Sequence, residues 1–311
     1  MGLETEVSLP WQRYWEGVRQ TGKTLGPTEG LAALERYWTR FFGSVASPNL
    51  TIVDLASGDG ALFDLYRSVV GGLEGSTYIA SDISAAALTH RKQTEKKSVL
   101  MFGEHLALKP ESVDCLVSQY GWEYTASDRR FDAFDLVKSE GSIGLVIHVA
   151  ESQLIKDAGI NLDAIGRLSK TRLFDRLSSE RQSNALTPPL GTEQEDRAMR
   201  ELQSSLQEVE VILRVFGDRI AGGFILGIYF ELAELIELMR ANPSDVQGRA
   251  RVLASEIVSY QRLVETQFRS ALSRQERNLL HNQLANRGFR VRQQELFDRP
   301  GLIGLAIHAT R

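Results

Sequence analysis

The sequence is poor in cysteine, in basic runs and in clusters of metal-binding residues. Its single cysteine, Cys115, lies within an apolar run. One thiol cannot form an intrachain disulfide or a cysteine-based metal site, so we expect Cys115 to behave as a small buried hydrophobe. No group of histidine, aspartate and glutamate has the spacing of metal ligands, and we therefore expect no metal.

An excess of charge of one sign is missing too. The 311 residues include 36 basic and 40 acidic side chains, which are well mixed and leave a net charge of −4. Proteins that hold a nucleic-acid backbone concentrate lysine and arginine along one surface, and no basic run of that kind is present. Nucleic acid is therefore not an expected partner.

A long apolar run is also absent. The most apolar segment, residues 222–239, contains Glu231, Glu234 and Glu237, which argues against a membrane span. The acidic start of the sequence has neither the basic nor the apolar region of a signal peptide, and Glu6 breaks the pattern for myristoylation. These observations lead us to expect a cytoplasmic protein without a membrane partner.

A strand–loop–helix pattern is present near position 50. Residues 51–55 are apolar enough for a buried strand, and residues 61–66 have helical spacing. Gly58 and Gly60 lie between them, where glycine lets a ligand approach the main chain and the N–H groups at the helix start. A dinucleotide fingerprint needs a small residue where Phe63 stands, so an NAD-dependent oxidoreductase is the disfavoured alternative.

The same stretch resembles motif I of the class I S-adenosylmethionine (SAM)-dependent methyltransferases, an acidic residue at a strand end followed by x-Gly-x-Gly. The resemblance implies that Asp54 organises the loop around the amino-acid end of SAM. It also implies that Ala56, Ser57, Gly58 and Gly60 line the cofactor. Ala56 stands where the family usually has glycine, and alanine fits this position if its φ is negative.

A second strand is expected at residues 77–81, with Asp82 at its end and a helix after it. An acid in this position can accept hydrogen bonds from both ribose hydroxyls. The alternative is that Asp82 or Ser84 caps the helix. The string Ser-Asp-Ile-Ser at 81–84 resembles motif II of the same family, in which the residue at Ile83 packs on the adenine.

Further candidates follow the third and fourth expected strands, at residues 99–102 and 112–118. The resemblance implies that Glu104 contacts the adenine amino group, with His105 beside it. The fourth strand resembles the entry to motif IV, and ligands of open α/β sheets bind at the carboxyl ends of strands. We expect cofactor contacts from Ser118 and Gln119, and substrate contacts from Tyr120, Trp122 and Tyr124, although these aromatic residues could simply pack.

Two residues are candidates for proton transfer. His148 lies near the end of a fifth expected strand, at 144–149, which follows an expected helix at 129–139. Histidine titrates near neutrality, so His148 could act as a general base, and Glu123 could do so through a water. A purely structural role for His148 is the alternative.

Helices are expected elsewhere. Aromatic residues at 8–43 predict two helical segments, which either pack on the domain or form a flap that brings Trp15 to the substrate. Residues 150–287 have no strand pattern; their apolar stripes predict helices at 161–184, 199–216, 225–239 and 246–268. These stripes could pack together or against a second copy of the chain.

A helix at 279–288 and strands at 289–297 and 302–308 resemble the antiparallel C-terminal hairpin of the family.

We therefore expect an α/β protein with a Rossmann-like, seven-stranded, mostly parallel sheet and an antiparallel C-terminal strand. Residues 50–150 and 276–311 would form this core, residues 1–49 an N-terminal helical flap, and residues 151–275 an all-α helical lid. The resemblance implies transfer of a methyl group from SAM to an oxygen or nitrogen of a small molecule, with S-adenosylhomocysteine (SAH) as product. The alternative is a non-catalytic module that binds SAM or SAH and uses its helical insertion as a homodimer or partner interface.

Overall fold

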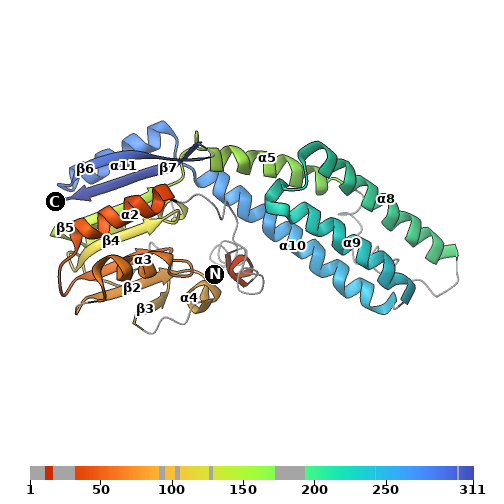
Figure 1. Cartoon of the computed structure of the whole chain (residues 1–311), viewed down its shortest axis with the longest axis horizontal. Coiled ribbons are helices and arrows are strands. Elements are labelled where there is room, and N and C mark those ends of the chain that lie inside the picture. The colour runs from red at the N-terminus through yellow and green to blue at the C-terminus, as the bar shows by residue number, and fades with distance from the viewer. Residues whose placement is uncertain are drawn as a thin grey trace. The chain divides into compact units, whose positions relative to one another are not determined.

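The computed structural model describes residues 11–16, 32–73, 75–90, 95–101, 106–125, 129–171, 193–241, 243–299 and 301–311. The chain divides into two compact units (Figure 1). Unit 1 comprises Met1–Lys156 and Thr266–Arg311, and unit 2 comprises Asp157–Glu265. The two boundaries fall within helices α5 (Gln153–Leu168) and α10 (Pro243–Ser270).

Unit 1 contains a seven-stranded sheet of order β3-β2-β1-β4-β5-β7-β6. The strands are β1 (Thr51–Leu55), β2 (Thr77–Asp82), β3 (Lys97–Leu100), β4 (Val113–Gln119), β5 (Val137–Ile147), β6 (Arg290–Asp298) and β7 (Gly301–Thr310). The first five are parallel, whereas β7 pairs antiparallel with both β5 and β6. The predicted fold class is confirmed.

The central strands β1 and β4 are buried on both faces, which is why they are nearly continuous apolar runs. Its helices are α2 (Ala32–Val45), α3 (Ala61–Val70), α4 (Ala85–His90) and α11 (Arg274–Asn286). Successive strand residues face opposite sides: Ile52 packs in a core with residues of α2 and α3, and Val53 in a core with residues of α11. Cys115 is buried in the first of these cores, as predicted.

The aromatic residues of α2 pack the helix onto the sheet. Trp38, Phe41 and Phe42 are fully buried, and a side chain at Gly144 of β5 would lie 2.6 Å from the ring of Phe41. Glycine at this strand position therefore lets the aromatic ring rest on the sheet backbone. For the second aromatic segment, the packing interpretation is confirmed.

The helix predicted at 129–139 is wrong. A short 3₁₀ helix, η3 (Asp132–Leu136), occupies its middle, and β5 already begins at Val137. Val137 pairs with Val113 of β4, and the register then shifts before Cys115 pairs with Ser142. Pairing with β4 on one side and β7 on the other overrides the local pattern, since strand preference depends on such neighbours.

Unit 2 is built from α helices. They are α5, α8 (Glu193–Phe216), α9 (Phe224–Ala241) and α10, with the 3₁₀ turn η5 (Ile220–Gly223) between α8 and α9. Their apolar stripes meet in one core that includes Val209, Leu232 and Ile257. The last three predicted helices are confirmed; α5 ends at Leu168, and the rest of the helix predicted to Asn184 lies largely outside the described residues.

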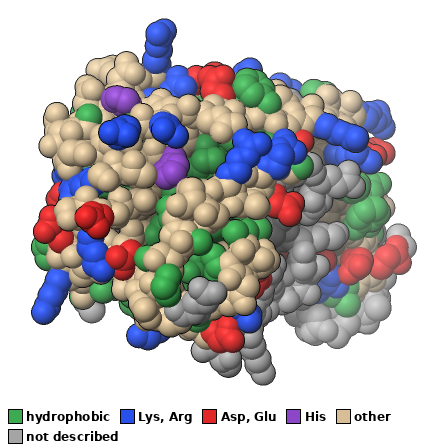
Figure 2. All heavy atoms as spheres, turned by 60° about the vertical axis from the view of Figure 1, so that its left-hand side comes forward, with side chains coloured by type: hydrophobic (Ala, Val, Ile, Leu, Met, Phe, Trp, Pro, Cys, Tyr) green, Lys and Arg blue, Asp and Glu red, His purple; other side chains and the backbone are tan. Residues whose placement is uncertain are grey.

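The surface agrees with the mixed composition. On the face drawn in Figure 2, basic and acidic side chains are interspersed. Within the described ranges, no helix combines the length and the apolarity needed to cross a membrane.

Candidate active site

The loop after β1 is a tight turn held by main-chain bonds. Ser57 N donates to Ser81 O (2.9 Å), and Gly60 N donates to Ser57 O (3.0 Å). Gly58 and Gly60 have φ values of 55° and 89°, in the left-handed region that favours glycine. Both predicted glycines are therefore required by the backbone of this turn.

Ala56 departs from its expected conformation. Its φ is 52° and not negative, so alanine here occupies a left-handed conformation that its Cβ makes unfavourable. A Cβ on Gly121, in the turn after β4, would collide with the Cβ of Ala56. Glycine at position 121 thus accommodates the methyl group that Ala56 adds to the loop.

Asp54 is a buried acid with one unsatisfied oxygen. Tyr78 donates its hydroxyl to Oδ2 of Asp54 (2.9 Å). Burial raises the pKa of Asp54 to about 7, against the smaller lowering effects of the Tyr78 hydrogen bond and the Lys96 charge. Asp54 Oδ1 and Ser57 Oγ are buried and have no hydrogen-bond partner among the residues that the structure describes.

Asp82 joins the loops that follow β1 and β2. Its Oδ2 accepts from Gly58 N (2.9 Å) and its Oδ1 from Ser84 N (2.8 Å). Burial raises the pKa of Asp82, and these backbone bonds act against the rise. Ser84 in turn caps α4, because its Oγ accepts from Ala87 N (3.2 Å). Ile83, the predicted adenine contact, is half-buried between them.

A helical segment, residues 11–16, contacts both loops. A Cβ on Gly58 would lie 2.7 Å from Cζ2 of Trp15, so the indole ring rests on the glycine backbone. Gln12 Oε1 accepts from Ser84 Oγ (3.1 Å) and from Ala86 N (3.3 Å). Trp15 therefore lies at the loop predicted to hold the cofactor and not among the predicted substrate residues.

Glu123 and His148, the two candidates for proton transfer, form a buried pair. Glu123 Oε1 accepts from the His148 backbone N–H (2.8 Å) and lies 2.7 Å from His148 Nδ1. An ionised carboxylate can only accept, so with Glu123 ionised the Nδ1 of His148 is the donor in this contact. Glu123 Oε2 is buried without a hydrogen-bond partner in the described part of the chain.

Three further side chains surround this pair. The amide nitrogen of Gln267 lies 3.3 Å from His148 Nε2. The Tyr120 ring lies 4.3 Å from the His148 ring between centroids, and its hydroxyl donates to a β7 carbonyl. Burial, and secondly the Glu123 charge, raises the pKa of the Tyr124 hydroxyl, which stays protonated.

A cavity of about 290 Å³ opens beside the pair, within unit 1. Its lining comes from η2 (Trp122–Tyr124), from residues that follow η2, from the end of α10 and from the start of α11. The lining residues are Glu123, Tyr124, Thr125, Arg130, Thr266, Arg269, Ser270 and Glu276. Tyr124 also contacts Trp11, with 5.1 Å between ring centroids, so segment 11–16 touches this region as well as the cofactor loop.

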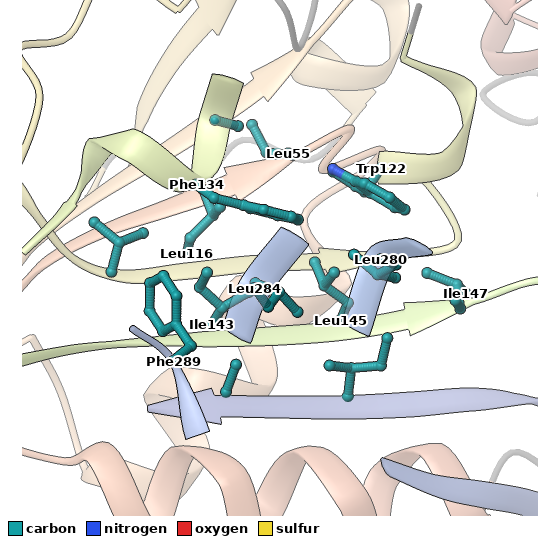
Figure 3. Close-up of a cluster of buried hydrophobic side chains, with 14 of the residues drawn as sticks. Leu55, Leu116, Trp122, Phe134, Ile143, Leu145, Ile147, Leu280, Leu284 and Phe289 are labelled. Atoms are coloured by element: carbon teal, nitrogen blue, oxygen red, sulfur yellow. The ribbon is translucent and has the colours of Figure 1, made fainter. Parts of the chain in front are cut away.

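Other predicted residues have structural contacts. Trp122 lies in the core, stacked on Phe134 at 5.5 Å between centroids (Figure 3). Ser118 Oγ donates to Leu55 O and accepts from Trp122 N, which ties the turn after β4 to β1. Gln119 Oε1 accepts from the indole N–H of Trp38 (2.7 Å). The predictions for Glu104 and His105 lie outside the described residues.

Four residues of this region escape prediction from sequence. Gln267, Arg130 and Arg269 reach the Glu123 region from separate segments, and Lys96 is buried near Asp54 with its charge lowering that acid's pKa. None of these four residues lies at the end of a predicted strand or within a known sequence motif. A lysine next to another lysine, or an arginine on a long helix, is ordinarily a solvated charge.

Among the described residues, no group of histidine, cysteine, aspartate and glutamate could hold a metal ion. Comparison of the sequence with protein-family models and with curated proteins finds no match. Similar solved structures are SAM-dependent methyltransferases, compared over part of the chain.

One is a SAM-dependent methyltransferase from Aquifex aeolicus, 11% identical over 37% of this chain and 66% of its own, with a TM-score of 0.33. Another is the 1,6-didemethyltoxoflavin N1-methyltransferase of Burkholderia thailandensis with bound 1,6-didemethyltoxoflavin and SAH. It is 13% identical, the comparison covers 48% of this chain and 66% of its own, and the TM-score is 0.36. A third is phosphoethanolamine N-methyltransferase 1 of Haemonchus contortus in complex with phosphoethanolamine and SAH. It is 14% identical, the comparison covers 46% of this chain and 33% of its own, and the TM-score is 0.36.

These likenesses are low, and this chain spans about two thirds or less of those three structures. They concern the fold alone. The strand order 3-2-1-4-5-7-6, with β7 antiparallel to its neighbours, is the Rossmann-like topology of methyltransferases. Unit 1 therefore has the fold of the class I methyltransferases, the family that the sequence motifs resemble.

Proposed function

We propose that this protein is a SAM-dependent methyltransferase that acts on an oxygen or nitrogen of a small molecule. The observation that carries the proposal is a pair of buried polar atoms at the end of β1 and on the loop after it, Asp54 Oδ1 and Ser57 Oγ, which have no hydrogen-bond partner within the described part of the chain. Leaving a buried polar atom unsatisfied costs about 1–3 kcal/mol, and a polar ligand in this loop would remove that cost.

The residues present fit this cofactor. A protonated amine near Asp54 would favour its ionised form and offset the burial that raises its pKa. Asp82 accepts backbone N–H groups on both oxygens, but a carboxylate offers about four acceptor positions, so it retains capacity for ribose hydroxyls. The left-handed glycines leave the loop backbone open to close approach.

When bound, SAM supplies a methyl group on a sulfonium, already activated for in-line displacement. The task of the protein is then to orient the acceptor and to receive its proton. Glu123 is the better candidate for the proton, because its buried Oε2 has no hydrogen-bond partner among the described residues and the residue is part of the cavity lining. His148 holds Oε1 by two hydrogen bonds and thereby orients the carboxylate, so we assign it a positioning role.

Turnover tests the proposal. The full chain is incubated with methyl-labelled SAM and a library of small metabolites, and SAH release is followed. Release that depends on one acceptor, together with label in that acceptor, is the expected result. Absence of both SAM binding and SAH release would contradict the proposal.

The second candidate is a non-catalytic module that binds SAM or SAH. The observation that favours it is the contact of Trp15 with Gly58 and of Gln12 with Ser84, which puts segment 11–16 against both predicted cofactor loops. Binding of SAM without turnover on any acceptor would support this candidate. A Trp15→Ala variant that binds SAM more tightly than the wild type would show that the indole ring competes with the cofactor.

A further inference from the structure

The cavity beside Glu123 has a lining that suits one kind of acceptor. All of its lining residues belong to unit 1, and they include two arginines, Arg130 and Arg269. Its volume of about 290 Å³ is at the small end of ligand pockets. It lies at the carboxyl end of β4, the side of an open α/β sheet where ligands bind.

Arg130 is a buried cation whose charge is poorly matched. Its residue is only 9% exposed, and its Nε has no hydrogen-bond partner within the described ranges. Its ion pair with Glu276 is long, 3.8 Å from Nη2 to Oε1. The other oxygen of Glu276 is held by the N–H and the hydroxyl of Ser273 at the start of α11. A buried charge is costly unless it is paired and hydrogen-bonded, so Arg130 has capacity for an anion.

Aromatic packing orients the Arg130 side chain. Its guanidinium carbon lies 5.6 Å from the centroid of the Trp122 ring and 5.4 Å from that of Phe131. The carbonyl of Arg130 also accepts from the Trp122 indole N–H at 2.7 Å. Trp122, a residue predicted to contact the substrate, thus orients Arg130, and Arg130 lines the cavity.

Arg269, near the end of α10, supplies a second positive charge to the lining of the same cavity. Guanidinium groups present a planar fork of donors that matches a carboxylate or a phosphate. Glu123, which also lines the cavity, is the group to which we assign the acceptor's proton. A molecule bound in the cavity would place its anionic group at the arginines.

We propose that the methyl acceptor carries an anionic group, a carboxylate or a phosphate, which binds Arg130 and Arg269. This inference names the substrate class and rests on the proposed function.

Anion binding to the full chain provides the test. Inorganic phosphate and acetate are titrated separately, with calorimetry and thermal shift as readouts, so that the two sources of negative charge are compared directly. The variants are Arg269→Ala, at an exposed side chain, and Arg130→Met, which keeps the apolar stem. Arg274→Ala is the matched control, because Arg274 is exposed on α11 and does not line the cavity.

We expect at least one of the two anions to bind the wild type and Arg274→Ala within about twofold of each other. Loss of one charge-assisted contact should weaken that anion by about tenfold or more in Arg269→Ala and in Arg130→Met. Binding that is equal in all four proteins, or absent for both anions, would overturn the inference. If Arg130→Met does not fold, Arg269→Ala decides the result.

An SAH titration of the same samples separates the two proposals. If the protein binds SAH but binds neither anion, the anionic-acceptor inference is overturned and the cofactor assignment stands. Arginine-dependent anion binding without SAH binding leaves the anion site standing and removes the methyltransferase assignment.

Discussion

Unit 1 buries charged side chains along one edge of its sheet, whereas the described core of unit 2 is apolar. In unit 1, Asp54, Asp82, Glu123 and His148 are all at most 7% exposed, and each lies at or just beyond the carboxyl end of a strand. In unit 2, Ser205 is the one buried polar side chain among the described residues. Burying charge is costly, so the comparison supports our proposal that the ligand sites belong to unit 1, whereas the described helices of unit 2 pack against one another.

The largest expected effect follows removal of the buried carboxylate at position 123. Glu123→Gln keeps one oxygen for the two His148 contacts but cannot receive a proton on the other position. We expect turnover to fall by about 10²–10⁴-fold, the usual contribution of a general base, with SAH affinity within about twofold of wild type. Glu140→Gln, at an exposed glutamate of β5, is the control for the change in charge. Full activity of Glu123→Gln would remove Glu123 from the reaction.

Truncation in the core of unit 2 should affect stability without affecting cofactor binding. Leu232 of α9 is fully buried, so Leu232→Ala should lower the free energy of unfolding by about 2–5 kcal/mol. Phe230→Ala, on the same helix but 56% exposed, should change it by less than about 0.5 kcal/mol. Urea unfolding measures both, and SAH affinity is compared below the unfolding transition. A loss of SAH binding in Leu232→Ala would contradict the assignment of cofactor binding to unit 1 alone.

The buried acid of the cofactor loop should make stability depend on pH. The pKa of Asp54 is raised from 3.8 to about 7, so the folded state binds a proton more tightly than the unfolded state and stability falls as pH rises through this range. From pH 5 to pH 8 the loss from this residue should be about 2–3 kcal/mol. Asp54→Asn should lack that loss, as measured by urea unfolding of both proteins at the two pH values. An equal pH dependence would mean that Asp54 is ionised in the folded protein.

The smallest expected effect concerns the strained alanine. Ala56→Gly should raise the free energy of unfolding by about 1 kcal/mol, because glycine adopts a φ of 52° without a Cβ penalty. The same change at Ala285, an exposed position within α11, should lower it by about 1 kcal/mol. Thermal or urea unfolding distinguishes the two signs. A destabilised Ala56→Gly would show that the packing of the methyl group at Gly121 outweighs the backbone strain.

Much of the sheet could be predicted because its strands are apolar and end in polar residues. The strands β1, β2 and β4 and the C-terminal hairpin follow from such patterns, whereas the expected sheet comes from the family resemblance. The start of β5 could not be predicted, since Val137 is strand through its pairing with Val113 of β4, and pairing with β7 begins only at Ser142. Pairing of distant segments is invisible to local periodicity.

The site was predictable only in part, for a similar reason. Asp54, Gly58 and Asp82 stand in a short motif, and Glu123 and His148 follow strands, so their candidacy could be read from the sequence. Gln267 reaches His148 across 119 positions from the end of a long helix whose stripe indicates packing. No motif records the left-handed φ of Ala56 or the close approach of Gly121 to its methyl group.

Titration of the full chain with SAH by calorimetry, in parallel with Asp82→Ala, tests the central claim most directly. Asp82 joins the loops after β1 and β2 through Gly58 N and Ser84 N. We expect the wild type to bind one SAH per chain and the variant to bind at least about tenfold more weakly, the effect of losing charge-assisted hydrogen bonds. Absence of binding to the wild type, or equal affinity in the two proteins, would contradict the claim that this edge of unit 1 is a SAM site.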